Sequence, residues 1–100
     1  MYSTQALTDL ERVVDFLAEQ DLNAALQTID LIEEALQVLR HHPYIGREID
    51  TELRELVISR GRTGYLARYS FEEVHDTVLV LAIRHQREAG YAQVVDADGE

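Results

Sequence analysis

The sequence contains no cysteine, no lysine and no tryptophan, and it has a single proline. Without cysteine, neither a disulfide framework nor a thiolate metal site can form. No apolar run approaches the ~20 residues that a membrane-spanning helix requires, so none is predicted. Charged residues at Asp9, Glu11 and Arg12 argue against a secretory signal. We therefore expect one cytoplasmic domain that needs no metal or cofactor.

The charge is strongly one-sided, with 19 acidic residues against 9 arginines and a net charge of −10. Residues 1–46 hold eight acidic side chains and two arginines, residues 47–87 hold seven of each, and residues 88–100 add four acids. This balance argues against a nucleic acid partner, because phosphate contacts dominate such affinities. The arginine-bearing half still suits a smaller anionic partner, since a guanidinium binds carboxylate and phosphate through parallel hydrogen bonds.

A first amphipathic helix is predicted to begin with a cap at Thr4 or Thr8 and to run to about Gln20. Apolar residues recur every three or four positions and form one face. Acids such as Asp9 are left for the solvent side. The apolar set is Leu7, Leu10, Val14 and Leu17, widened by Val13 and Phe16.

A second amphipathic helix is predicted from Leu22 to about Arg40, with Asp21 or Asn23 as its cap and Pro43 just beyond its end. Its apolar set is Leu22, Leu26, Ile29, Ile32, Leu36 and Leu39. The short link makes the two helices an antiparallel hairpin. Their joint apolar surface is too wide for the helices alone to bury, so we expect a sheet to cover it.

Three strands are predicted, over residues 53–58, 65–71 and 77–83, joined by short links into an antiparallel meander. Residues 77–83 are apolar or β-branched on both faces, which is typical of a strand covered on two sides, so we expect this strand at the centre. Residues 1–3 are the candidate for a fourth, edge strand. The prediction is one α+β domain over residues 1–91, followed by an acidic, flexible tail over residues 92–100.

Arginines are the candidate functional residues. Arg54, Arg68 and Arg84 each lie in a predicted strand, and Arg87 follows the last one. Any one of them alone is best interpreted as a solvated or ion-paired surface residue. Several in one substructure could converge on one face of the sheet and bind an acidic peptide or a phosphate backbone. Two further arginines, Arg60 and Arg62, lie in the turn between the first two predicted strands.

His85 is the histidine best placed for catalysis, at the end of the last predicted strand. A lone histidine there is more often an ordinary surface residue than a general base. The four histidines show no spacing typical of metal ligands. The sequence carries neither a phosphate-binding glycine loop nor a nucleophile elbow.

Several segments in a fixed order resemble the RelE/ParE toxin superfamily over residues 1–91. After the two acidic helices come His42-Pro43-Tyr44-Ile45-Gly46-Arg47, Leu53-Arg54-Glu55-Leu56, Tyr65-Leu66-Ala67-Arg68-Tyr69, and a last run from Val78 to Arg87 that ends Arg84-His85-Gln86-Arg87. The resemblance implies an N-terminal antiparallel helical hairpin packed on a three- to four-stranded twisted antiparallel sheet. It also implies the toxin of a type II toxin–antitoxin system, bound by its antitoxin in a hetero-oligomer.

The superfamily resemblance leaves three functions open. The loop from Pro43 to Arg47 and the Arg84-His85-x-Arg87 ending look more like the ParE side, whose members bind and inhibit DNA gyrase, and the lysines expected of the RelE type are absent. Arg54, Arg68, Arg84 and Arg87 would then bind the target, and Arg54 and Arg68 would also meet the antitoxin. The alternative is a RelE-like ribosome-dependent mRNA endonuclease with His85 as its acid–base group, although Gln86 stands where histidine-using members carry tyrosine. The third is a degenerate scaffold that binds antitoxin without toxicity.

Overall fold

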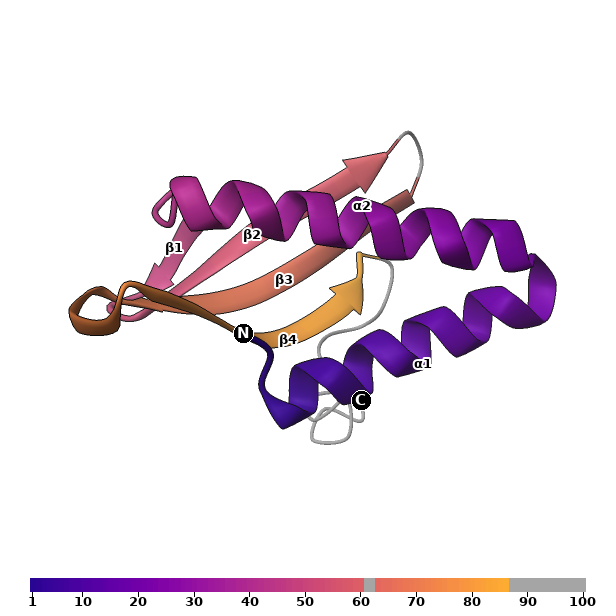
Figure 1. Ribbon diagram of the computed structural model, residues 1–100, viewed down its shortest axis with the longest axis horizontal. Helices are drawn as coiled ribbons and strands as arrows, with labels where there is room; N and C mark the ends of the chain where they lie inside the picture. Colours follow the sequence, from indigo (N-terminus) through magenta and orange to yellow (C-terminus); the bar gives the residue numbers. More distant parts are fainter. Residues whose placement is uncertain (61–62, 87–100) are drawn as a thin grey trace.

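The computed structural model describes residues 1–60 and 63–86. Two helices, α1 (Thr4–Gln20) and α2 (Leu22–His41), precede a four-stranded antiparallel sheet (Figure 1). The strands are β1 (Arg47–Asp50), β2 (Leu53–Arg60), β3 (Thr63–Glu72) and β4 (Thr77–His85), with a 3-10 turn at Glu73–His75 before β4. The predicted α+β fold is confirmed. The predicted tail, 92–100, and the domain end at residue 91 lie outside the described residues. No helix in the described ranges is long and apolar enough to cross a membrane.

The helix caps only partly match the sequence prediction. Ser3, not Thr4 or Thr8, caps α1: its backbone is extended and its Oγ accepts the Ala6 N–H at 3.0 Å. Thr4 is already the first helical residue, so it cannot serve as the cap. Asp21 caps α2 as predicted, because its carboxylate accepts the Asn23 N–H at 3.0 Å.

The strands follow in the order β1-β2-β3-β4, so β3 is paired on both sides and β4 is the last strand. The expectation of a central β4 was therefore wrong. Its outer edge is nevertheless closed, because Tyr2 forms a parallel bridge with Val80, Ser3 N–H donates to Val80 O at 2.8 Å and Val80 N–H donates to Met1 O at 2.8 Å. Val80 in β4 thus has backbone partners on both edges, as a residue of an inner strand would, although residues 1–3 add only a bridge to the sheet.

Strand β1 was not predicted. All four of its residues are exposed, so they show none of the apolar alternation that marks a half-buried strand. Residues 1–3, the candidate fourth strand, contribute only the bridge at Tyr2. The fourth strand of the sheet is thus formed by the segment between α2 and β2.

Asp9 lies inside the molecule, contrary to its predicted place on the solvent side. Its side chain is fully buried; Oδ2 accepts the Ile83 N–H at 2.9 Å and Oδ1 accepts Gln5 Nε2–H at 2.8 Å. The N–H of Ile83 points away from β3 and needs an acceptor, which α1 supplies. Asp9 therefore joins α1 to the edge of β4.

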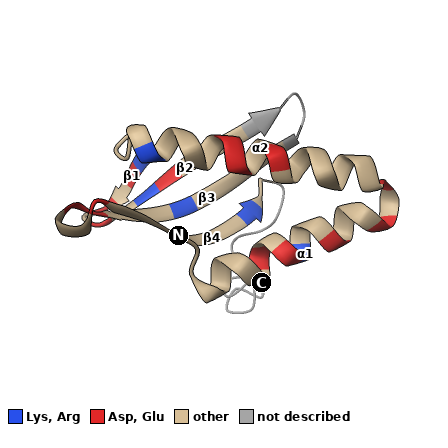
Figure 2. Cartoon of the chain, viewed as in Figure 1, with Lys and Arg blue, Asp and Glu red and all other residues tan. Residues whose placement is uncertain are grey.

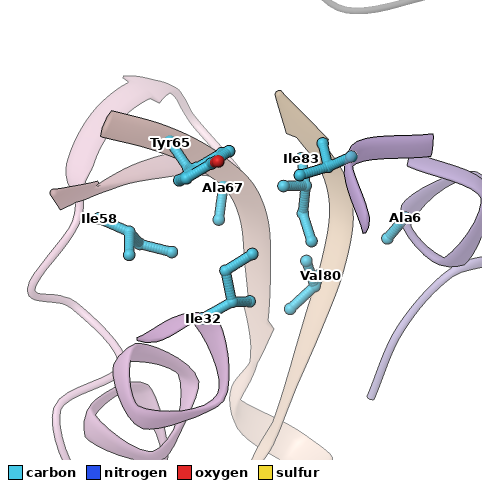
Figure 3. Packing of buried hydrophobic residues seen from close by; sticks show 8 residues of the cluster. Ala6, Ile32, Ile58, Tyr65, Ala67, Val80 and Ile83 are labelled. Atoms are coloured by element: carbon cyan, nitrogen blue, oxygen red, sulfur yellow. The ribbon is translucent and has the colours of Figure 1, made fainter. Parts of the chain in front are cut away.

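The hydrophobic core lies between the helices and one face of the sheet (Figure 3). Its buried residues are Ala6, Val13, Ile32, Ile58, Tyr65, Ala67, Val80 and Ile83. The sheet does not cover the whole hairpin, whose linked end extends beyond the strands (Figure 1). Leu22 and Leu26 near that end, and Leu7 on α1, are more than half exposed, so the predicted apolar face is only partly buried.

Candidate functional site

The second face of the sheet, which we call the outer face, points away from the helices. Arg47 on β1 lies opposite Glu55 on β2, and Glu55 lies opposite Arg68 on β3. Directly opposed residues project from the same face of a sheet. The core residue Ala67 is adjacent to Arg68 in β3 and therefore projects from the other face. Arg47, Glu55 and Arg68 thus form a row of alternating charge across three strands.

Arg84 on β4 completes this cluster. It pairs with Leu66, two residues before Arg68, so Arg84 also projects from the outer face. Arg68 and Arg84 are diagonal neighbours, a relation in which Cα atoms are ~7–8 Å apart and long side chains can act together. Figure 2 shows arginine on both strands. We call Arg47, Glu55, Arg68 and Arg84 the arginine face.

An ion pair organises one side of the arginine face. Arg47 Nη2 lies 3.0 Å from Glu55 Oε1, and the two side chains differ sharply in exposure, 78% for Arg47 against 9% for Glu55. A carboxylate this deeply buried must be held by cations and donors to stay charged. Glu55 is therefore an anchor, while most of the Arg47 side chain faces solvent.

Arg54 lies on the opposite side from the arginine face. Its partner across the strands is Tyr69, and its Nη1 donates to Tyr44 O at 3.0 Å and Gly46 O at 2.8 Å. The guanidinium carbon also lies 5.1 Å from the centre of the Tyr44 ring, within the range of a cation–π interaction. Arg54 therefore holds the loop between α2 and β1.

Tyr69 on β3 also holds this loop through hydrogen bonds. Its hydroxyl donates to Pro43 O at 2.8 Å and accepts the Gly46 N–H at 2.8 Å. Burial raises the pKa of Tyr69, and the Gly46 hydrogen bond opposes that rise. A Cβ on Gly46 would stand 2.6 Å from the Tyr69 hydroxyl, so only glycine fits here. We call Arg54 and Tyr69, with the loop they hold, the loop clip.

Tyr44 ties this loop to the turn before β4. Its hydroxyl donates to the carboxylate of Glu73, and this hydrogen bond is the main cause of a raised Tyr44 pKa. The Tyr44 ring also meets Phe71 edge to face, with centroids 5.3 Å apart. The loop is thereby fixed to β2, to β3 and to the 3-10 turn.

His85 lies on the helix side of β4. It is the strand partner of Tyr65, a core residue, and the two rings pack edge to face with centroids 5.1 Å apart. The neighbouring Arg84 projects from the other face, although its Nη1 reaches back to His85 O at 3.3 Å. The predicted site residues therefore divide, with Arg68 and Arg84 on the outer face and Arg54 and His85 on the helix side. Arg87 and Arg62 lie outside the described residues, as does the side chain of Arg60.

A groove of about 560 Å³ lies on the helix side, between α2 and the start of β4. Burial and the nearby carboxylate of Glu33 raise the pKa of Tyr2 in its wall. Across residues 1–60 and 63–86 no group of acids and histidines could hold a metal ion. The lining residues are Met1, Tyr2, Glu33, Leu36, Gln37, Arg40, Asp76, Thr77, Val78 and Val80.

The sequence interpretation did not single out Arg47, Glu55 or Tyr69 as site residues. Arg47 belongs to a strand that was not predicted, so its face could not be assigned. The signal for Glu55 was available in the alternation of β2, which separates it from Arg54, Leu56 and Ile58. Only the register between strands could show that Glu55 and Arg68 are neighbours.

Comparison with known proteins places these features in context. Residues 1–90 match the family model described as the ParE toxin of the type II toxin–antitoxin system, parDE. A protein of Caulobacter vibrioides named Toxin RelE1 is 35% identical over 69 residues, covering 69% of this chain and 74% of the relative. Toxin RelE3 of the same organism is 33% identical over 84 residues, covering 84% of this chain and 89% of the relative.

Proposed function

The chain belongs to the ParE toxin family of type II toxin–antitoxin systems, and from this premise we propose that it acts by binding and inhibiting DNA gyrase. The family brings with it a cognate antitoxin as partner. We assign the gyrase contact to the arginine face, with Arg68 and Arg84 as its central cations. We also assign Arg68 to the antitoxin, so that antitoxin and target would compete for one side chain.

The position of His85 carries this proposal. An endonuclease of the superfamily would need an acid–base group within hydrogen-bonding reach of the same phosphate that its arginines hold. His85 packs against Tyr65 on the helix side, whereas Arg68 and Arg84 project from the outer face. Inhibition by binding requires no proton transfer, so it does not require His85 to lie on the same face of the sheet as Arg68 and Arg84.

The charge distribution supports a protein target. The arginine face holds three arginines and one carboxylate, with Arg47 and Arg68 on either side of Glu55, in a chain whose net charge is −10. Exposed charges are screened beyond ~8–10 Å at ordinary ionic strength, so a small cationic cluster attracts nearby carboxylates. The phosphate backbone of a nucleic acid would extend beyond this small cluster, and the excess acidic residues of the chain would repel it.

A second candidate is a ribosome-dependent mRNA endonuclease. It is favoured by the names of the two relatives, Toxin RelE1 and Toxin RelE3, which point to the RelE side of the superfamily. In that case His85 would be the acid–base group, and Arg54, Arg68 and Arg84 would hold the phosphate. This function requires His85 to reach substrate around the end of β4.

Two activity measurements on purified protein separate the candidates. We expect inhibition of gyrase supercoiling, and no cleavage of ribosome-bound messenger. Arg68→Ala and Arg84→Ala should weaken inhibition, while Arg40→Ala on α2, outside the arginine face, should not. Cleavage of the messenger without inhibition of gyrase would establish the second candidate. Absence of both activities, with the antitoxin still bound, would identify a degenerate scaffold.

A further inference from the structure

We propose that Arg47 is a third anion-binding residue of the arginine face, and that Arg54 and Tyr69 position it from the other side of the sheet. The identity of the target rests on the proposed function; the positioning does not. Arg54 is thus a positioning residue, although its sequence context predicts an anion ligand.

Gly46, the last residue of the loop, and Arg47, the first residue of β1, are held from opposite faces by two adjacent residues of β2. Arg54 Nη1 holds Gly46 O at 2.8 Å on the helix side, and the carboxylate of Glu55 holds the Arg47 guanidinium at 3.0 Å on the outer side. Arg54 and Glu55 point to opposite faces because side chains alternate along a strand. The backbone at Gly46 and the side chain of Arg47 are therefore both fixed by β2.

The neighbouring pair on β3 repeats this arrangement. Tyr69 lies opposite Arg54, and its hydroxyl bonds to Pro43 O and to the Gly46 N–H, each at 2.8 Å. Arg68 lies opposite Glu55 on the outer face. The loop clip fixes the backbone one residue before Arg47, which leaves the direction of the Arg47 side chain determined by Glu55. A long exposed arginine held in this way loses little further freedom when it binds.

The geometry also points to the chemistry of the ligand. Arg47 and Arg68 stand two strands apart, which is ~10 Å at the usual strand spacing, with Glu55 between them. Each guanidinium presents a planar set of donors that suits one carboxylate or one phosphate group. The face therefore suits separate anionic groups about that far apart, as on the surface of an acidic protein.

Arg54 itself is poorly placed to bind a ligand. One nitrogen of its guanidinium already donates to two backbone carbonyls, and the group lies over the Tyr44 ring. Lysine at this position keeps the charge but not the planar geometry that meets both carbonyls and the ring. Arg54→Lys therefore keeps the positive charge and removes the contacts that hold the loop.

A double-mutant cycle on binding to purified DNA gyrase tests the coupling. We expect Arg47→Ala to weaken binding tenfold or more, as for a charge-assisted hydrogen bond. Arg54→Lys should weaken it several-fold in the otherwise unchanged protein and not at all in the Arg47→Ala background. The matched control is Arg40→Lys, which should leave binding unchanged. Additive losses would overturn the inference, because Arg54 would then meet the target itself.

A second measurement needs no target and separates the inference from the proposed function. The side-chain NMR signal of Arg47 is followed during titration with inorganic phosphate, a probe for a single anionic group. We expect Arg47 and Arg68 to respond together, and Tyr69→Phe and Arg54→Lys to weaken the Arg47 response while Arg84 keeps its own. Circular dichroism confirms that each variant is folded. If Arg47 does not respond, or if Tyr69→Phe leaves its response unchanged, the inference is wrong even if gyrase is the target. If it responds as expected and gyrase is not bound, only the proposed function fails.

Discussion

The same strands build two faces that serve different purposes. On the helix side, β3 and β4 contribute Tyr65, Ala67 and Ile83 to a core with almost no exposed surface. On the outer face the same two strands present Arg68 and Arg84. One step along a strand thus exchanges a core residue for an arginine at Ala67–Arg68 and at Ile83–Arg84, and we expect these sequence neighbours to respond differently to substitution.

The largest expected effect compares Ile83 with Val57. Ile83→Asp should abolish folding, because an uncompensated buried charge costs several kcal/mol, on the order of the total stability. Val57 projects from the outer face and is 56% exposed. Val57→Asp should cost about 1 kcal/mol or less. Urea unfolding followed by circular dichroism measures both, and a folded Ile83→Asp variant would contradict the division between the faces.

The next largest loss of stability is expected at Asp9, a fully buried carboxylate that links α1 to β4. Asp9→Ala leaves the Ile83 N–H without its acceptor, at a cost of about 1–3 kcal/mol. Asp15→Ala, an exposed change on the same helix, is the control. Urea midpoints of the two variants should differ clearly. Equal midpoints would mean that the hydrogen bond from Ile83 to Asp9 contributes nothing to stability.

Tyr69→Phe tests the hydroxyl that joins the loop to the core. Loss of two hydrogen bonds should lower stability by about 1–2 kcal/mol. The pKa of Tyr69 is raised by burial, so its neutral form stabilises the fold below pH ~10, and that stability is lost as the pH rises through the folded pKa. The alkaline loss of stability should therefore be smaller in Tyr69→Phe. It should not vanish, because burial raises the pKa of Tyr2 as well.

The smallest effect is expected at His85. In a growth-arrest assay without antitoxin, Arg84→Ala and Arg87→Ala should relieve toxicity through lost charge-assisted hydrogen bonds, whereas His85→Ala should change it little. A general acid–base residue would instead contribute about 10²–10⁴-fold. Full rescue by a folded His85→Ala variant would favour the endonuclease.

The sequence predicted most of the fold because helical periodicity and β-rich runs are local signals. Both helices, and the strands β2, β3 and β4, are present close to their predicted bounds. The errors lie where one segment depends on another. Asp9 was assigned to solvent because the sequence does not show that it accepts the N–H of Ile83 in β4. Strand β4 was assigned to the centre because the sequence does not show that the N-terminal residues, rather than another strand, pair with its outer edge.

The candidate site was less predictable than the fold. Alternation alone separates Arg54 from Glu55, and Arg84 from His85, yet it cannot say which face the helices cover. Arg47 required a strand with no apolar signature, and its place beside Arg68 required the register of three strands. The presence of arginine suggested anion binding, but the sequence could not distinguish an arginine that binds an external anion from one, such as Arg54, that holds a loop of the protein itself.

The closure of β4 by the first residues of the chain has a consequence for biosynthesis. Ser3 Oγ donates to Leu81 O across 78 residues, and Asp9 accepts the Ile83 N–H across 74. The first helix leaves the ribosome early, but the strand edge on which it docks is among the last described parts to emerge. Contacts so distant in sequence form late, because the intervening chain must be ordered first. A nascent chain lacking β4 therefore exposes the part of α1 that β4 covers, and docking of that helix on the sheet awaits translation of residues 77–85.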